Sequence, residues 1–177
     1  MSIHLLLVST ADTDLLAARD CGAEDRLANP ARTAATDVPA LLDGVDLAVV
    51  RLLGGRRAWE EGLATVLASG VPTVALGGEA TPDAELMAAS TVPAGVVVQA
   101  LDYLVEGGPE NLRELARFLS DTVLYTGEGF AAPARTPGYG IHGEREHRSG
   151  SPTVGIVFYR AHALAGNTAF VDTFADA

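Results

Sequence analysis

The chain has 177 residues, the usual size of one domain or of one domain joined to part of another. With 48% hydrophobic and 20% charged residues, its composition is that of a globular protein and not of a disordered one. Its 23 acidic and 12 basic residues give a formal net charge of -11, and a surface of that sign repels nucleic-acid phosphates and anionic lipids. We therefore expect neither nucleic acid nor a membrane surface among its partners.

The reactive side chains narrow the chemistry further. Every basic residue is an arginine, so the chain has no lysine for a Schiff base or for the phosphate-binding loop of a Walker-type ATPase. The one cysteine, Cys21, cannot form a disulfide within the chain or a multi-cysteine metal site, which is typical of a reducing compartment. The sequence has no apolar run long enough for a membrane span and no signal-peptide pattern at its start. We expect a cytoplasmic protein.

The first two thirds of the chain alternate apolar runs with helical patterns. Short, continuous apolar runs at 3–8, 45–53 and 71–76 are typical of strands buried on both faces. Two further helices are predicted at 96–106 and 109–126, separated by a pair of glycines. Such alternation predicts an α/β fold in which helices flank a mostly parallel sheet, of the Rossmann-like or flavodoxin-like kind.

A helical pattern also follows each apolar run. The first run leads into a helix through a Ser-Thr-x-Asp stretch, and the second leads into one through Gly54 and Gly55. After the third run, Thr81 is expected to be the N-cap and Pro82 the first residue of a helix. The two glycines could belong to a nucleotide-binding loop, but the GxGxxG pattern is absent, which favours a tight turn.

The rest of the chain changes in composition. Residues 127–151 are rich in glycine, proline and arginine without any period, and we interpret them as a linker or a loop laid on the surface. A buried-strand pattern returns at 152–160 and leads into a helix; this unit either docks on the first domain or begins a second one, and we favour a piece of a larger protein. The expected organisation is an amino-terminal α/β domain (1–128), a linker (129–151) and the start of a second α/β unit (152–177).

Two acidic clusters are candidates for a metal. Glu79, Asp83 and Glu85 follow the third apolar run, although acidic residues are also common at the start of a helix for electrostatic reasons. The other cluster has two imidazoles and two carboxylates, a donor set that would suit cobalt. Its histidines are five residues apart in a glycine-rich stretch, unlike the helical spacing of four in known zinc motifs, which favours a solvated linker. Its members are His142, Glu144, Glu146 and His147.

Four residues form the more informative candidate site. Arg160, His162, Gly166 and Asn167 lie just after the last apolar run, where a parallel sheet places its ligands. A guanidinium, an imidazole and an amide that converge there could hold the polar periphery of a ligand. Helix capping and ordinary surface polarity are the alternative explanation.

The sequence resembles the amino-terminal region of the CobN family of cobaltochelatase large subunits, which is similar to the large subunit of magnesium chelatase. The resemblance is weakest at 20–44 and 131–150. It is carried by four long stretches in the family's order: RLLGGRRAWEEGL (51–63), GGEATPDAELMAASTVPAG (77–95), YLVEGGPENLRELARFLSDTVLYTGEGF (103–130) and PTVGIVFYRAHALAGNTAFVD (152–172).

The resemblance implies ATP-dependent insertion of cobalt(II) into hydrogenobyrinic acid a,c-diamide, a step of aerobic cobalamin biosynthesis. Its implied partners are the remainder of the large subunit, separate AAA+ ATPase subunits and the tetrapyrrole. ATP, magnesium and cobalt(II) would serve the complete complex, and we expect no cofactor, no metal ligand and no catalytic residue in this chain. Arg160, His162, Gly166 and Asn167 are the implied substrate-binding residues. We expect this chain by itself to be inactive.

A function of a different class also fits the pattern. The chain would then be a free-standing, non-catalytic α/β module that binds a corrinoid or another small anionic ligand. A last helix that docks on the first domain would favour this module, whereas an incomplete last strand and helix would favour the chelatase.

Overall fold

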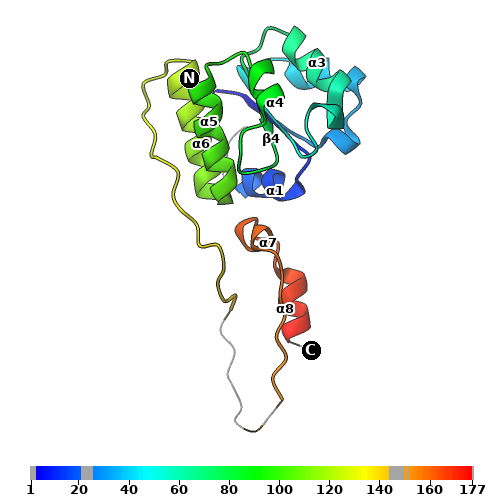
Figure 1. Cartoon of the computed structure of the whole chain (residues 1–177), viewed down its shortest axis with the longest axis vertical. Helices are drawn as coiled ribbons and strands as arrows, with labels where there is room; N and C mark the ends of the chain where they lie inside the picture. Colours follow the sequence, from blue (N-terminus) through cyan, green and yellow to red (C-terminus); the bar gives the residue numbers. More distant parts are fainter. Residues whose placement is uncertain (1–2, 21–25, 144–149, 151, 177) are drawn as a thin grey trace.

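The computed structural model describes residues 3–20, 26–143, 150 and 152–176. Its centre is a parallel sheet with the strand order β2-β1-β3-β4 (Figure 1). The strands are β1 (Leu5–Ser9), β2 (Arg26–Ala28), β3 (Leu47–Leu52) and β4 (Thr73–Gly77). The predicted parallel α/β sheet is therefore confirmed, and its order begins like that of the flavodoxin-like fold.

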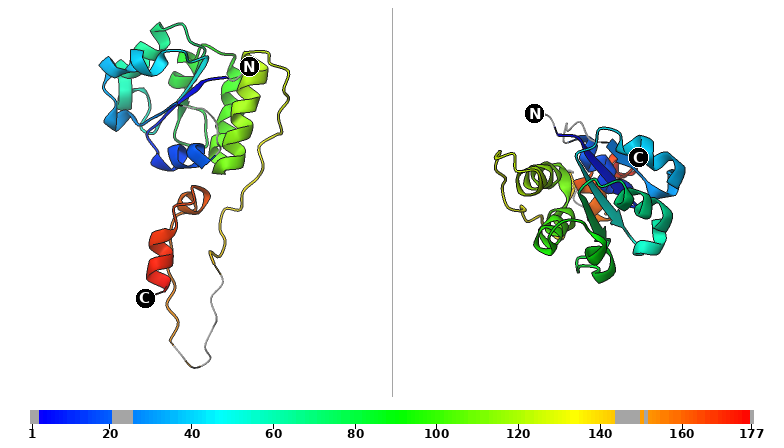
Figure 2. Two further views of the ribbon diagram at one scale, coloured as in Figure 1. Left: turned by 180° about the vertical axis from the view of Figure 1, so that it is seen from behind. Right: turned by 90° about the horizontal axis from the view of Figure 1, so that it is seen from above.

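Helices cover both faces of the sheet, as the views in Figures 1 and 2 show. Side chains alternate along a strand, so Leu5 and Leu7 of β1 belong to one buried cluster and Leu6 and Val8 to the other. The first cluster is completed by α1 (Asp12–Asp20), α5 (Ala94–Glu106) and α6 (Gly108–Val123). The second is completed by α2 (Val38–Leu42), α3 (Glu60–Ala68) and α4 (Ala84–Ala89). Burial on both faces explains why the strands are continuous apolar runs.

The helices predicted in the first two thirds of the chain are present, with a correction at the start of α4. Its N-cap is Asp83, not Thr81, and the helix begins at Ala84. The Asp83 carboxylate accepts hydrogen bonds from the backbone N–H groups of Glu85 (2.9 Å) and Leu86 (3.0 Å). A carboxylate at this position satisfies two free donors and favours the positive end of the helix dipole, which explains why the helix starts after Asp83.

Short elements fill the region around 26–44, where the sequence pattern is weakest. The edge strand β2 was not predicted, because three residues are too few to show a period. Two short 3-10 helices lie in this region, η1 (Pro30–Arg32) and η2 (Ala35–Asp37), and a further one, η3 (Arg56–Trp59), precedes α3. Cys21 lies outside the described residues.

The prediction of a strand at 152–160 is wrong for this structure. Residues 152–159 carry no regular secondary structure, and α7 (Arg160–Leu164) begins where the strand was expected to end. A strand forms only beside a partner strand, and none of the described strands pairs with this segment. The single helix expected after it is divided into α7 and α8 (Ala169–Ala175), with Gly166 (φ 65°) in the turn between them. The three proposed domain boundaries remain predictions.

The first part of the linker is laid on the surface. Glu114 on α6 accepts a hydrogen bond from the backbone N–H of Ala131 (2.7 Å). Asn111 donates to the carbonyl of Ala134 (2.9 Å) and accepts from its N–H (2.8 Å). These hydrogen bonds attach the loop backbone to α6. Further along, residues 137–143 and 152–159 run away from the sheet together with α8 (Figures 1 and 2).

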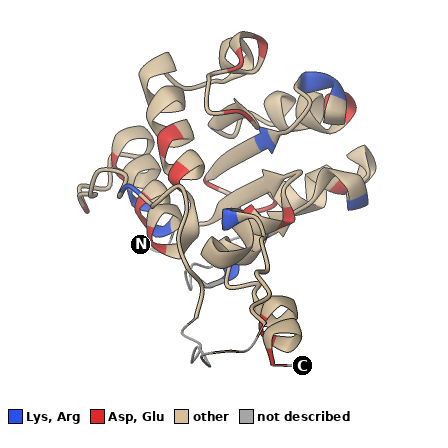
Figure 3. Ribbon diagram, turned by 60° about the horizontal axis from the view of Figure 1, so that its bottom comes forward, with Lys and Arg blue, Asp and Glu red and all other residues tan. Residues whose placement is uncertain are grey.

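The charged residues belong mainly to the helices and turns around the sheet, as the colours of the ribbon in Figure 3 show. None of the described helices is both long and apolar enough to cross a bilayer.

Candidate functional site at the carboxyl edge of the sheet

The carboxyl ends of β1 and β3 lie side by side at the point where the strand order reverses. The chain passes from β1 to β2 on one side and from β2 across to β3 on the other. In open α/β sheets, the crevice at this reversal is the usual position of a ligand. The register pairs Ser9 at the end of β1 with Arg51 of β3, so two polar residues meet there.

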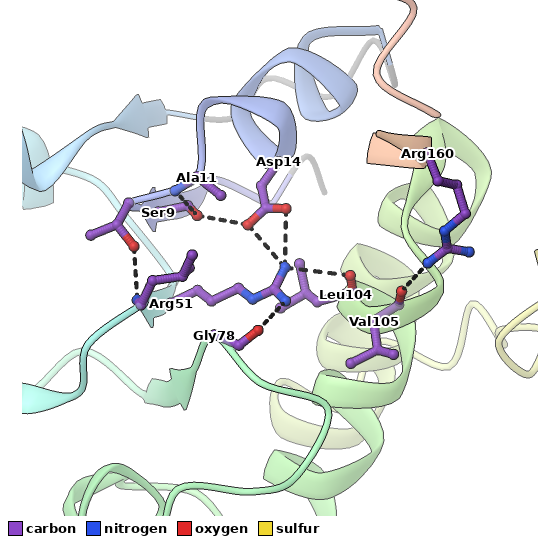
Figure 4. A network of polar contacts seen from close by, with 10 residues as sticks. Ser9, Ala11, Asp14, Arg51, Gly78, Leu104, Val105 and Arg160 are labelled. Carbon is purple, nitrogen blue, oxygen red and sulfur yellow. Dashed lines mark hydrogen bonds and ion pairs between the residues drawn. The ribbon is translucent and has the colours of Figure 1, made fainter. Parts of the chain in front are cut away.

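Arg51 is a buried arginine held by a polar network (Figure 4). Its Nη1 lies 3.0 Å and 3.1 Å from the two carboxylate oxygens of Asp14 and also donates to the carbonyl of Leu104 (3.4 Å). Nη2 donates to the carbonyl of Gly78 (3.0 Å). The exposed fractions of the Arg51 and Asp14 side chains are only 10% and 12%, so each charge depends on the other for compensation.

Ser9 orients the acidic partner. Its Oγ donates to Asp14 Oδ2 (2.6 Å) and accepts a hydrogen bond from the N–H of Ala11 (3.0 Å). The network thus ties β1, the first turn of α1, β3, the loop after β4 and the end of α5 together. Among the described residues, the buried Nε of Arg51 has no hydrogen-bond partner.

The close approach of the loop after β4 explains a glycine there. A Cβ on Gly78 would lie 2.3 Å from Cγ of Leu53 and 3.0 Å from its Cα, so a larger residue would push the Gly78 carbonyl away from Arg51. Gly54 and Gly55 (φ 93° and 74°) form a tight turn after β3. This agrees with the interpretation as a turn that the sequence favoured over a nucleotide-binding loop.

Helix α7 lies over this edge and borders a small, partly open cavity. The cavity has a volume of about 190 Å³, and Asp14, Arg51, Gly78, Arg160 and Leu164 are among the residues that line it. Sites for small organic ligands usually have about 300–1,000 Å³. The volume of this cavity is therefore below that of a site for a tetrapyrrole.

Arg160 points inward and attaches α7 to the domain. Its Nη2 donates to the carbonyl of Val105 (3.0 Å), and Nη1 contacts the hydroxyl of Thr136. Glu106 binds the same threonine, accepting from its N–H (2.8 Å). That backbone hydrogen bond is the largest cause of a lowered pKa of Glu106, and the Thr136 hydroxyl and the charges of Arg160 and Arg135 lower it further.

Of the other three candidate residues, His162 lies on α7, and Gly166 and Asn167 lie in the turn between α7 and α8. The His162 ring packs edge-on against Phe170, with ring centres 5.3 Å apart, and its buried Nδ1 has no partner among the described residues. Gly166 and Asn167 are exposed, and the Asn167 N–H donates to the carbonyl of His162 (2.9 Å). The structure thus brings Gly166 and Asn167 together but turns Arg160 away from them.

Asn167 also borders a second, larger groove. The groove has a volume of about 770 Å³, within the range of small-molecule sites. Its polar lining mixes both charges, with Asp12 and Asp37 beside Arg19 and Arg32. Arg160 lines the smaller cavity instead, so the four candidates do not converge on one ligand-sized space.

The described residues contain no group of three or more His, Cys, Asp and Glu side chains that could hold a metal ion. Asp83 and Glu85 have structural positions at the start of α4. His142 Nε2 lies 3.1 Å from Asp172 Oδ1. The other three members of that candidate cluster, Glu144, Glu146 and His147, lie outside the described residues.

Comparison with known proteins shows where this architecture occurs. A family model described as CobN/Magnesium Chelatase matches residues 101–177. The catalytic subunit of cobaltochelatase from Mycobacterium tuberculosis is 46% identical, with a TM-score of 0.83 over 99% of this chain and 15% of that chain. The match of the family model places residues 101–177 in the CobN/magnesium chelatase family. The resemblance predicted from the four sequence stretches is thereby confirmed.

A curated relative is also similar over most of this chain and over a small part of its own length. The aerobic cobaltochelatase subunit CobN of Pseudomonas aeruginosa is 29% identical over 170 residues, which cover 85% of this chain and 14% of that protein. The chain therefore spans about a seventh of the length of these CobN relatives.

Sequence reasoning missed the network of Arg51 and Asp14. A signal was present, because a serine and an arginine each interrupt or end an apolar run that is buried on both faces. The partner, Asp14, could not be separated from other acidic residues near a helix start, since helix capping explains such residues equally well.

Proposed function

We propose that the chain is the amino-terminal domain of a cobaltochelatase large subunit in the cytoplasm. The complete enzyme would insert cobalt(II) into hydrogenobyrinic acid a,c-diamide at the expense of ATP. One observation carries this proposal: the 46% identity to a cobaltochelatase catalytic subunit extends over 99% of the chain, with a TM-score of 0.83. ATP and magnesium would be used by AAA+ partner subunits, which agrees with a sequence that has no lysine for a phosphate-binding loop.

Within that enzyme, the domain would have a positioning role. The polar groups at the carboxyl edge of its sheet form hydrogen bonds with one another, as the contacts of Arg51 with Asp14 and Gly78 illustrate. The 190 Å³ cavity beneath α7 leaves no room for a macrocycle. Both observations support a domain that places α7 and the residues after it, while metal insertion takes place elsewhere in the complete subunit.

The four candidate residues would divide this work. The substrate carries carboxylate and amide groups, which the side chains of His162 and Asn167 and the backbone at Gly166 can bind by hydrogen bonds. The exposure of Gly166 and Asn167 supports this role. Arg160, whose guanidinium is bound to Val105 and Thr136, would position α7 and thereby the other three.

The docking of α7 on the first domain also favours the second candidate function in part. A free-standing module that binds a corrinoid or another small anion would use the 770 Å³ groove beside Asn167. Titration of the chain with a corrinoid, followed by tryptophan fluorescence, tests this alternative; the chelatase proposal predicts no saturable binding by the chain alone.

A chimera tests the chelatase proposal directly. The chain would replace the matching region of the Mycobacterium tuberculosis subunit, and cobalt insertion would be followed by absorbance in the presence of the ATPase subunits, ATP and magnesium. We expect activity from the chimera and none from the chain alone, for either cobalt insertion or ATP hydrolysis. A folded but inactive chimera, or turnover by the chain alone, would contradict the proposal.

A further inference from the structure

Residues 152–159 form an apolar segment that the described residues leave largely uncovered. The exposed fractions of Val154, Val157 and Tyr159 are 85%, 97% and 81%. The segment contains no charged residue, although the chain as a whole has a net charge of -11. Figure 1 shows it as an extended trace beside α8, away from the sheet. Exposed apolar stretches of this kind in a globular protein mark a surface that another part covers.

Both sides of this segment are apolar. In an extended chain, successive side chains point to opposite sides, so Ile156 and Phe158 lie on one side and Val157 and Tyr159 on the other. Phe158 already packs against Phe170 of α8, with ring centres 6.3 Å apart, whereas Val157 is almost fully exposed. Strands that are apolar on both sides occur inside parallel sheets, between two layers of helices.

The segment is held at its carboxyl end. Arg160 follows it directly and is bound to the carbonyl of Val105 and to Thr136, while Leu164 of α7 lies close enough to contact a Cβ built on Gly107 at 3.4 Å. An apolar segment followed at once by a helix repeats the order of β3 and η3–α3 in the described sheet. The carboxyl end of the segment is therefore fixed to the first domain through α7.

We propose that residues 152–159 are an unpaired strand that joins a parallel sheet in the body of the chelatase large subunit. This inference rests on the function proposed above. The relatives are about seven times longer than this chain, and their similarity runs through the segment. A second copy of the chain is the less suitable occupant, because two surfaces of net charge -11 repel each other.

Pairing of this strand would also determine where the candidate substrate-binding residues lie. His162, Gly166 and Asn167 lie within eight residues of the end of 152–159, so they would lie near the carboxyl edge of the completed sheet. Ligands of open parallel sheets bind at that edge. The first domain would then contribute to the substrate site by delivering these residues, without touching the metal.

Hydrogen–deuterium exchange of the isolated chain and of the chimera tests the pairing. In the isolated chain, the amides of 154–159 should exchange like those of an unstructured peptide. In the chimera they should exchange at least about 100-fold more slowly, since a central strand is protected by its ladder of hydrogen bonds. Fast exchange in both proteins would overturn the inference.

Two pairs of variants separate pairing from burial. Val157→Pro removes a backbone donor that a central strand needs, whereas Val157→Thr keeps both the donor and the β-branched shape. Tyr159→Asp places a charge in the segment, and Tyr125→Asp is its control, because the two tyrosines are 81% and 86% exposed. We expect Val157→Pro and Tyr159→Asp to abolish protection in the chimera, with all four variants leaving the unfolding temperature of the isolated chain unchanged. Protection that survives Val157→Pro would contradict strand pairing.

The outcomes distinguish this inference from the proposed function. A chimera that protects 154–159 but inserts no cobalt would refute the function and keep the strand. A chimera that inserts cobalt but leaves the amides of 154–159 unprotected would support the function and refute the strand. Sedimentation of the isolated chain adds a third outcome: dimers that Val157→Pro dissociates would identify a second copy as the occupant and overturn the proposal.

Discussion

Arg51 and Asp14 form a buried ion pair at the point where the strand order of the sheet reverses, with Nη1 3.0 Å from Oδ1. The pair fills the place where related folds bind a ligand. Because it joins β3 to the first turn of α1 and reaches the carbonyls of Leu104 and Gly78, it stabilises the edge on which α7 rests.

The pair should be essential for stability. Asp14→Ala leaves the guanidinium of Arg51 buried without a counter-charge, and we expect a loss of about 3–5 kcal/mol in the free energy of unfolding, measured with urea. Glu110→Ala is the control, since the exposed pair of Glu110 with Arg113 should contribute less than about 1 kcal/mol. The double variant Asp14→Ala/Arg51→Met should recover part of the loss; no recovery would contradict a cost due to uncompensated charge.

Gly62 should not tolerate a side chain. A Cβ at this position would lie 2.0 Å from Cε2 of the buried Trp59, whose Nε1 donates to the carbonyl of Thr33 (3.1 Å). We expect Gly62→Ala to cost about 1–3 kcal/mol by overpacking, despite the better helix propensity of alanine. The change should alter the fluorescence of this single tryptophan.

Gly95 provides the matched control for Gly62. It also lies in a helix, α5, but nothing is within 4 Å of a Cβ built there. Gly95→Ala should therefore be neutral or stabilise the chain by up to about 1 kcal/mol. Equal destabilisation by the two substitutions would show that Trp59 is not the cause.

Glu106 should make stability depend on acid pH. Its pKa lies below the ordinary value of 4.5, chiefly because the N–H of Thr136 donates to the carboxylate. A lowered pKa in the folded state adds stability that is present above the unfolded value and is lost as the pH falls through the folded value. The unfolding temperature of the wild-type chain should thus fall more steeply below about pH 4.5 than that of Glu106→Gln.

Arg160 should act through α7. Arg160→Ala removes hydrogen bonds to Val105 and Thr136, which should cost about 1–3 kcal/mol and expose the amides of α7 to exchange. Thr136→Val should produce part of the same effect, because it removes the hydroxyl that Arg160 contacts.

Substrate affinity distinguishes Arg160 from His162 and Asn167. In the complete enzyme, His162→Ala and Asn167→Ala should weaken tetrapyrrole binding, measured by fluorescence quenching, without lowering the unfolding temperature by as much as Arg160→Ala. Unchanged affinity together with a lowered unfolding temperature for His162→Ala would assign that residue to packing against Phe170.

Much of the domain could be predicted from the sequence. Strands buried on both faces must be continuous apolar runs, so β1, β3 and β4 were visible without a structure. The helices α5 and α6 were equally clear, because a glycine pair with positive φ separates two amphipathic patterns. The four stretches of resemblance led to the family for a related reason: each has a local pattern long enough to be specific.

Only the tertiary structure decided how distant groups meet. The pairing of Arg51 with Asp14 and the attachment of the linker to Asn111 and Glu114 join residues that no local pattern connects. The apolar run at 152–159 also shows that local sequence alone does not decide the structure of a segment. Its residues have the composition of a buried strand. A strand, however, needs hydrogen bonds to a neighbouring strand, and none of the described strands pairs with this segment. Local sequence determines what a segment can become, whereas the available partners determine what it is.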